Sequence, residues 1–407
     1  MVLKEGYKHT DFGPVPPDWE TERLGTIVSI TSGESPSTIE FTADGSPYFK
    51  VEQLSSTEKY LNTFSTPYHF HNGKTVPLGS VIFAKRGAAI SLNKIRILAQ
   101  DSFMDTNLMA LVPDERLDVE FLYYELSYTG LWRLADTTSV PQINNKHVKP
   151  ILFPLPQKAE QRRIVSALSD VDVLLEGIER LVAKKRDLKQ AAMQQLVPGR
   201  TRLPGFVGEW HQTTLGEIGE CVIGLTYRPE DVANHGLLVL RSSNVQDGHL
   251  AYDDNVYVNI DVPGRLYTRC GDILVCVRNG SRALIGKCAL ISEATVPVTF
   301  GAFMSVFRTK YWRFIFHAFQ AESIQRQIRD NIGATINQIT NKDMAALRVT
   351  LPPEDEQLAI STVLNDMDAE ISALEQRLSK TRELKQAMMQ ALLTGRTRLI
   401  ATEVAYA

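Results

Sequence analysis

Two stretches of the chain carry apolar side chains at alternating steps of four and three residues, one within 164–182 and the other within 360–378. Side chains at these steps lie on one face of a helix, and the spacing is typical of a helix that packs along a partner helix. We therefore predict partner-helix packing for the apolar residues of both series: Ile164, Leu168, Val171, Leu175, Ile178, Val182, Ile360, Leu364, Met367, Ile371, Leu374 and Leu378.

The two series belong to one sequence repeat. The segment that begins at Leu155 aligns without a gap with the segment that begins at Leu351, at an offset of 196 residues. A proline lies near the start of each copy, and Gly199 and Gly395 lie where a helix-ending glycine is common. Each copy is predicted to be one helix of about forty residues, roughly 60 Å long at about 1.5 Å per residue.

The segments before the two helices also correspond, but only at a few points. Apolar runs rich in β-branched residues predict strands, which Gly, Pro and Asn turns interrupt. Short helices are predicted at 119–134 and 312–328, without a regular alternation of strand and helix. The matching points are Trp19 with Trp210, the apolar strand after Gly79 with that after Gly271, and the sequence Gln-Ile-x-Asn-Lys at Gln142 with that at Gln338.

The predicted fold is therefore of the α+β class, with two mixed α/β domains related by internal pseudo-symmetry. We place the first domain at 1–153, the first helical spacer at 154–200, the second domain at 201–349, the second helical spacer at 350–399 and a tail at 400–407.

Bulk composition narrows the classes of protein. A chain of 407 residues is too long for one compact core of usual size, and 43% hydrophobic with 22% charged residues is ordinary for a globular protein. No run of eighteen apolar residues occurs, which excludes a membrane span, and the first residues lack a signal peptide, so a cytoplasmic protein is expected. The net charge of -3 does not favour a nucleic-acid partner, but one basic face is enough to attract DNA.

The motifs of common catalytic sites are missing. Gly73-Lys74-Thr75 has the end of a phosphate loop, but Tyr68 occupies the position of its first glycine. No GxGxxG follows a strand, and Pro352-Pro353 lacks the flanking residues of an amino-methyltransferase loop. The four cysteines form no CxxC pair, and His69 with His71 lacks a third ligand nearby. We therefore predict no catalytic residue, no metal site and no cofactor in this chain.

Side chains suited to DNA recognition fall at corresponding points of the two domains. Arg and Lys recognise guanine edges and phosphates, and Asn and Gln recognise adenine edges. Glu52, Arg96, Ser242 and Ser281 add polar chemistry nearby. The predicted DNA-binding residues are Lys50, Gln53, Lys85, Arg86, Asn93 and Lys94 in the first domain, and Tyr227, Arg228, Arg241, Asn244, Arg278, Asn279 and Arg282 in the second.

Each of these residues also has a simpler interpretation, as a solvated surface group. The paired Gln-Ile-x-Asn-Lys elements lie just before the helices, so they are as well suited to seating the domain on its helix as to contacting DNA.

In this order, and twice over, the elements of the chain resemble the specificity subunit of type I restriction-modification systems. The resemblance covers nearly the whole chain. Its carriers are the Trp-x4-Leu-Gly openings at Trp19 and Trp210, the Gly-Asp-Ile-Leu strand at Gly271, the Gln-Ile elements, the Leu-Pro helix starts and the GRTRL helix ends. The first domain departs from the pattern, with Gly-Ser-Val-Ile at Gly79.

The resemblance implies two target recognition domains, joined and separated by two long antiparallel coiled-coil helices. It implies a non-catalytic subunit that binds double-stranded DNA, in which each domain recognises one half of a bipartite target and the helices set the spacer. It also implies two methyltransferase subunits docked on the helices and two restriction subunits beyond them. S-adenosylmethionine, ATP and magnesium would then belong to these partner subunits, which carry out adenine-N6 methylation and ATP-dependent cleavage.

Two other functions are compatible with parts of the sequence. One is a bipartite enzyme, such as a fused nuclease and methyltransferase fragment, against which the missing motifs argue. The other is a coiled-coil scaffold with two protein-binding domains, which would show no sequence dependence in DNA binding.

Overall fold

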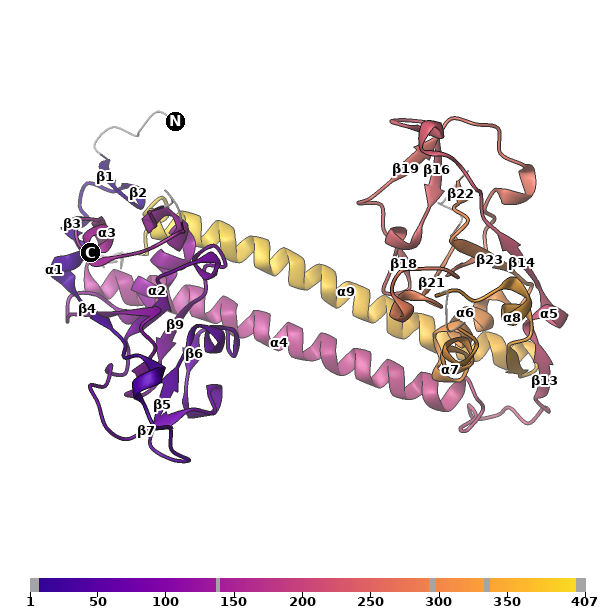
Figure 1. Ribbon diagram of the computed structural model, residues 1–407, viewed down its shortest axis with the longest axis horizontal. Coiled ribbons are helices and arrows are strands. Elements are labelled where there is room, and N and C mark those ends of the chain that lie inside the picture. The colour runs from indigo at the N-terminus through magenta and orange to yellow at the C-terminus, as the bar shows by residue number, and fades with distance from the viewer. Residues whose placement is uncertain (1–6, 137–139, 293–297, 333–336, 400–407) are drawn as a thin grey trace, which may run out of the picture. The chain divides into compact units, whose positions relative to one another are not determined.

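The computed structural model describes residues 7–136, 140–292, 298–332 and 337–399. These residues fall into two compact units, unit 1 from Met1–Glu179 with Arg377–Ala407 and unit 2 from Arg180–Gln376. The division passes through both long helices of Figure 1, α4 (Lys158–Leu196) and α9 (Glu354–Leu393). Each unit therefore holds one globular domain and a part of each helix, and the compact units do not follow the divisions predicted in sequence order. The predicted tail at 400–407 lies outside the described residues.

The globular domain of unit 1 is built on a five-stranded sheet with the order β4-β11-β8-β9-β6. Along its central strand β8, Val81 and Phe83 lie in the apolar cluster that contains α2, whereas Ile82 and Ala84 lie in the cluster on the other face. Because both faces are buried, the strand is a continuous apolar run. The bounds are β4 (Val28–Ser32), β11 (Leu108–Pro113), β8 (Val81–Ala84), β9 (Ile95–Leu98), β6 (Tyr60–Leu61), α2 (Val119–Thr129), and β10 (Phe103–Met104), β5 (Ser46–Phe49) and β7 (His69–Phe70) of a smaller sheet.

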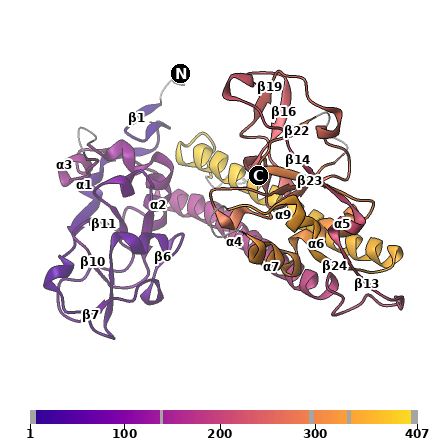
Figure 2. The ribbon, with the colours of Figure 1, turned by 45° about the vertical axis from the view of Figure 1, so that its right-hand side comes forward.

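Unit 2 repeats this plan with the sheet β14-β23-β20-β21, and its second sheet, β15-β19-β16-β22, is visible in Figure 2. Central strand β20 again alternates, with Ile273 and Val275 in one cluster and Leu274 and Cys276 in the other. The predicted α+β class and the predicted central strands are thus confirmed. The bounds are β14 (Glu220–Ile223), β23 (Met304–Arg308), β20 (Ile273–Cys276), β21 (Cys288–Leu290), β15 (Val232–Ala233), β19 (Val256–Val258), β16 (Leu237–Leu240) and β22 (Thr299–Phe300).

Short elements complete both units. A two-stranded sheet leads into each long helix, because β12 pairs with β3 and β24 pairs with β13. The remaining bounds are β1 (Lys8–Thr10), β2 (Gly13–Val15), β3 (Glu20–Arg23), α1 (Leu24–Ile27), α3 (Asn145–Val148), β12 (Leu152–Leu155), β13 (His211–Thr214), α5 (Leu215–Ile218), β17 (Val245–Gln246), β18 (His249–Leu250), α8 (Asn341–Ala345) and β24 (Arg348–Leu351).

Both predicted short helices are interrupted, so the prediction of one continuous helix in each segment is wrong. The first ends at Thr129, because Gly130 takes a left-handed conformation (φ +87°) before the 3₁₀ helix Leu131–Leu134. The second divides into α6 (Trp312–Gln320) and α7 (Glu322–Asn331) at Ala321, which is extended and buried. The break lets the apolar faces of both α6 and α7 reach one core cluster.

The long helices end as predicted. Gly199 follows α4 with φ +70° and Gly395 follows α9 with φ +64°, and the left-handed region is the usual conformation of a helix-ending glycine. Each glycine also lies against a tryptophan, since a Cβ at Gly199 would stand 2.9 Å from the Trp210 ring and one at Gly395 would stand 3.2 Å from that of Trp19. A larger residue would therefore clash with the Trp210 ring at position 199, and at position 395 it would clash first with the Pro16 ring, which lies nearer than Trp19.

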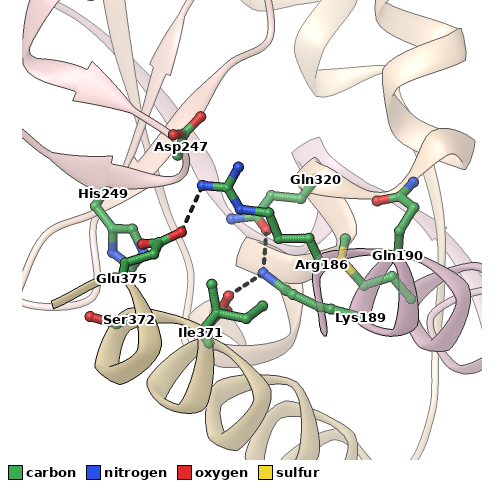
Figure 3. A pocket seen from close by; sticks show the side chains of 11 residues that line it. Arg186, Lys189, Gln190, Asp247, His249, Gln320, Ile371, Ser372 and Glu375 are labelled. Atoms are coloured by element: carbon green, nitrogen blue, oxygen red, sulfur yellow. Dashed lines mark hydrogen bonds and ion pairs between the residues drawn. The ribbon is translucent and has the colours of Figure 1, made fainter. Parts of the chain in front are cut away.

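The helices are antiparallel in each unit and are linked by ion pairs. Lys185–Glu370 (2.7 Å) in unit 2 has no repeat counterpart, because Thr381 and Leu174 occupy the equivalent positions. The other two pairs in each unit do have counterparts in the other unit, with the roles of α4 and α9 exchanged, as the repeat predicts. Figure 3 shows Arg186, Lys189 and Glu375 on the wall of a polar cavity of about 290 Å³. The pairs are Asp172–Lys385 (2.5 Å) and Glu179–Arg382 (2.6 Å) in unit 1, and Asp368–Lys189 (2.5 Å) and Glu375–Arg186 (2.6 Å) in unit 2.

The residues predicted to pack the helices lie on the inner faces of α4 and α9. Ile164, Leu168, Ile178, Val182, Ile360, Leu364 and Ile371 are buried, and Val171, Leu175, Met367, Leu374 and Leu378 are half-buried. Ile164 and Leu168 share one cluster with Leu392 of α9 and with Phe121 of the globular domain. The first turns of α4 therefore pack on the domain as well as on the partner helix.

A buried carboxylate joins the start of each long helix to the end of the other. In unit 2, Glu356 is fully buried and accepts hydrogen bonds from Arg202 (2.5 and 3.0 Å) and from the Trp210 indole (2.9 Å). The Arg202 guanidinium holds the pKa of Glu356 below its ordinary value. In unit 1, Glu160 makes the equivalent bonds to Arg398 (2.7 and 2.8 Å) and to Trp19 (3.1 Å).

Unit 2 also buries a histidine at the junction of α6 with α9. The Nε2 atom of His317 lies 2.9 Å from Oδ1 of Asn365, and its buried Nδ1 has no partner among the described residues. Burial lowers the pKa of His317 to about 4, and the charges of Lys189 and Asp368 act on it in opposite directions. The folded unit therefore holds this imidazole neutral.

We expect acidification to destabilise unit 2 through His317. The pKa of His317 in the unfolded chain is about 6.5. Between about pH 6.5 and pH 4 the unfolded state therefore binds more protons than the folded state, and the free energy of unfolding decreases as the pH is lowered. From pH 7 to pH 4.5 the loss is about 2 kcal/mol. His317→Phe should remove this part of the difference between urea midpoints measured at the two pH values. Equal pH dependence in both proteins would contradict the assignment.

Candidate nucleic-acid interface

Two arginines follow the central strands of the two sheets. Arg86 and Arg278 each lie two residues beyond the end of β8 or β20, and both side chains are exposed. Because β8 and β20 pair with β11 and β23 in the same antiparallel register, the two arginines occupy equivalent positions. Neither guanidinium has a hydrogen bond or an ion pair with any residue that the structure describes. Both are thus available to an external acceptor.

The Gln-Ile elements hold these strand ends in place. The N–H of Ile143 donates to the carbonyl of Lys85, and the N–H of Ile339 donates to that of Val277, both at 2.9 Å. Both isoleucines are buried. The backbone of each Gln-Ile element thus pairs with the strand end that carries the arginine. These elements therefore have a structural role, which was one of the two interpretations of the sequence.

Three of the predicted DNA-binding side chains are amides that satisfy the protein's own backbone. Gln53 and Asn244 lie at the same position of a short 3₁₀ helix, and each accepts the N–H of the cap residue, Lys50 or Arg241, at 2.9 Å. Asn93 bonds two backbone groups near the end of α2, at 2.9 Å each. We remove these three residues from the candidate interface because their polar atoms are already used. Arg96 is also removed, since it is buried.

The three predicted DNA-binding lysines of unit 1, Lys50, Lys85 and Lys94, lie close to rings and hydroxyls rather than to carboxylates. The Nζ atom of Lys50 stands 3.5 Å from the centre of the Tyr68 ring. Lys85 donates to Ser32 (3.1 Å) and Lys94 donates to Ser55 (2.6 Å). Partial burial, with the charge of Arg86 next, lowers the pKa of Lys85. Of the three lysines, Lys85 supplies positive charge next to Arg86.

In unit 2 most of the candidate side chains have partners within the protein. Tyr227 is half-buried against the apolar cluster that contains Leu274 and Cys276. The polar contacts are Arg241 with Asp254 (2.7 Å), Arg228 with Glu230 (3.7 Å), Arg282 with the carbonyl of Ile332 (3.3 Å) and Asn279 with Ser242 (3.0 Å). Among the candidates of this unit, Arg278 is the exposed cation without a polar contact to a described residue.

Two further residues lie beside the strand ends that carry Arg86 and Arg278, and they were not predicted from the sequence. Asn107 precedes β11 and Phe303 precedes β23, and both side chains are exposed beside the strand ends that carry the arginines. The signal that could have found them is their register opposite β8 and β20, which the amino-acid types alone do not give.

The described residues contain no group of three or more His, Cys, Asp and Glu side chains placed to hold a metal ion. His71 contacts Asp44 (3.0 Å) whereas His69 contacts Thr63 (3.1 Å), so the two histidines serve different partners. No helix in the described ranges combines the length and the apolar character that a bilayer crossing requires.

The model of the family described as type I restriction modification DNA specificity domain matches residues 16–184 and again residues 208–383. The chain belongs to this family. Each match covers most of one globular domain and a large part of the long helix after it, so the internal repeat is the family's repeating domain.

Relatives in this family match the whole chain or one half of it. The type I restriction enzyme MjaVIII specificity subunit of Methanocaldococcus jannaschii is 22% identical over 98% of this chain and 99% of its own length. The EcoKI specificity subunit of Escherichia coli is 25% identical over 46% of this chain and 42% of its own length.

Solved structures show the same fold. A chain from a study of complex assembly and conformational transition of the type I R-M system has a TM-score of 0.60 at 21% identity, covering 94% of this chain and 99% of that chain. The S subunit of a type I restriction-modification system from M. genitalium has a TM-score of 0.59 at 17% identity, covering 96% and 98%.

Proposed function

We propose that this chain is the DNA sequence-specificity subunit of a type I restriction-modification complex, and that it is itself non-catalytic. The observation that carries the proposal is the equivalent placement of Arg86 and Arg278, exposed and without polar partners among the described residues. An arginine edge can bond the O6 and N7 atoms of guanine in the major groove, or a phosphate. Each unit then recognises one half of a bipartite target, and different neighbours of the two arginines give different halves.

The long helices set the spacer between the half-sites and dock two methyltransferase subunits. Supporting this part, α4 carries Leu174, Leu181 and Leu188 at steps of seven residues, exposed by 41%, 40% and 46%. Exposed leucines at heptad steps are suited to a helical partner. Two restriction subunits complete the complex, and S-adenosylmethionine, ATP and magnesium are held by the partner subunits rather than by this chain.

Exchange of residues 204–349 for the second domain of another family member tests the division of labour. We expect the methylated motif of the assembled complex to change in one half-site only, because the first domain and both helices are retained. The motif is measured by sequencing methylated adenines in cells that express the complex. A change in both half-sites, or methylation by this chain alone, would contradict the proposal. DNA binding without any motif would favour a scaffold.

A further inference from the structure

The residue before β11 or β23 differs in chemistry between the units, although its backbone position is the same. The carbonyl of Asn107 accepts the N–H of Lys85 (2.9 Å), and that of Phe303 accepts the N–H groups of Val277 and Arg278 (3.0 and 3.1 Å). In both units this bond fixes the residue beside the strand end that carries the exposed arginine.

Phe303 is an exposed ring beneath an arginine. Its side chain is 54% exposed, and the guanidinium carbon of Arg278 lies 4.8 Å from the ring centre. An aromatic ring left in water forgoes the favourable free energy that contact with an apolar surface provides. Stacking uses the face of the guanidinium, so its N–H edge stays free. The preceding Gly301 and Ala302 have little side chain with which to screen the ring.

This combination fits two neighbouring base pairs in the major groove. An arginine edge recognises guanine there, and a phenyl ring makes an apolar contact with the 5-methyl group of thymine. The guanidinium and the ring are 4.8 Å apart, somewhat more than the spacing of about 3.4 Å between successive base pairs, so the two groups can reach neighbouring base pairs.

We propose that Phe303 is a specificity residue of unit 2, which contacts the 5-methyl group of a thymine next to the guanine that Arg278 recognises. This inference rests on the proposed function, since it requires that unit 2 binds DNA through this strand end. In unit 1 the equivalent Asn107 amide donates to Asp105 (2.9 Å), so that position is polar and makes no methyl contact. The two half-sites therefore differ in their dependence on a thymine methyl group.

A protein partner fits this surface less well. A specific protein interface buries about 1,200–2,000 Å² in total, whereas Phe303 offers one ring beside a charged side chain. A methyl contact needs only that ring.

The test compares thymine with uracil, which lacks the methyl group, in the assembled complex with its methyltransferase subunits. The methylated motif is determined first, and duplexes are then made with one thymine at a time replaced by uracil. At one thymine of the half-site of unit 2, wild-type binding should weaken about five-fold, as expected for one apolar methyl contact. Phe303→Asn should bind both duplexes equally, and its motif should no longer require that thymine.

Val207→Asn is the matched control, because Val207 is 91% exposed in unit 2 and lies outside the strand end. Val207→Asn should keep the wild-type ratio of binding to the thymine and uracil duplexes. Thermal unfolding should show that both variants are folded. An unchanged thymine preference in Phe303→Asn overturns the inference but leaves DNA recognition intact. An unchanged motif with weakened methyltransferase binding overturns it in favour of a protein contact. A wild-type complex without any motif overturns the proposed function itself.

Discussion

Glu356→Ala is expected to lower the free energy of unfolding of unit 2 by about 4 kcal/mol, the order found when one partner of a buried ion pair is removed. Glu356 is fully buried, and its loss leaves the Arg202 guanidinium, 30% exposed, without its anion. The Trp210 indole N–H also loses its acceptor. The carboxylate lies in the first turn of α9, where the helix dipole favours a negative charge.

The matched control is Glu375→Ala, which removes an ion pair with Arg186 whose side chains are 56% and 40% exposed. Its effect should stay below about 1 kcal/mol, because solvent screens such a pair. Urea unfolding followed by tryptophan fluorescence measures both. Because the pKa of Glu356 is lowered in the folded unit, its contribution is present above about pH 4.5 and is lost as the pH falls through the lowered value. Equal midpoint shifts in the two variants would contradict the assigned role of the buried carboxylate.

The repeat predicted the helices well because a helix face and a two-sided strand each leave a periodic apolar pattern. It did not predict which charges meet. Glu160 and Glu356 match at the repeat offset, as do Arg202 and Arg398, so the repeat alone was enough to identify these residues as equivalent. Their partnership, however, depends on the antiparallel register of α4 and α9, which places the end of one copy at the start of the other.

The candidate interface was predicted less well, for a physical reason. An amide that follows a strand can face a ligand or cap the turn of its own chain, and residue type does not separate the two. Asn244 and Gln53 cap their turns. Phe303 was missed for the opposite reason, since an apolar residue beside a strand is more often part of the core. Its exposure follows from the register of β23 against β20, which only the structure supplies.

Arg86→Ala and Arg278→Ala are each expected to weaken sequence-specific binding by the assembled complex about 10- to 100-fold, the range for loss of one bidentate base contact. The double variant should lose about 1,000-fold, because the arginines lie in separate units and their effects should add. Competition between target and random duplexes at one fixed salt concentration measures specific and non-specific affinity together.

The pattern across sequences identifies what each arginine contacts. If Arg278 bonds a base, its alanine variant relaxes one position of one half-site and leaves the other half-site unchanged; a phosphate contact instead weakens all duplexes alike and lowers the salt dependence. Arg116→Ala and Arg326→Ala are the matched controls, since both arginines are exposed and paired with a carboxylate on their own surface. Equal losses in these controls would show a general effect of charge. Unaltered binding in Arg86→Ala and Arg278→Ala would place the interface away from the strand ends, because neither guanidinium has a hydrogen bond or an ion pair within the described residues that could mask its removal.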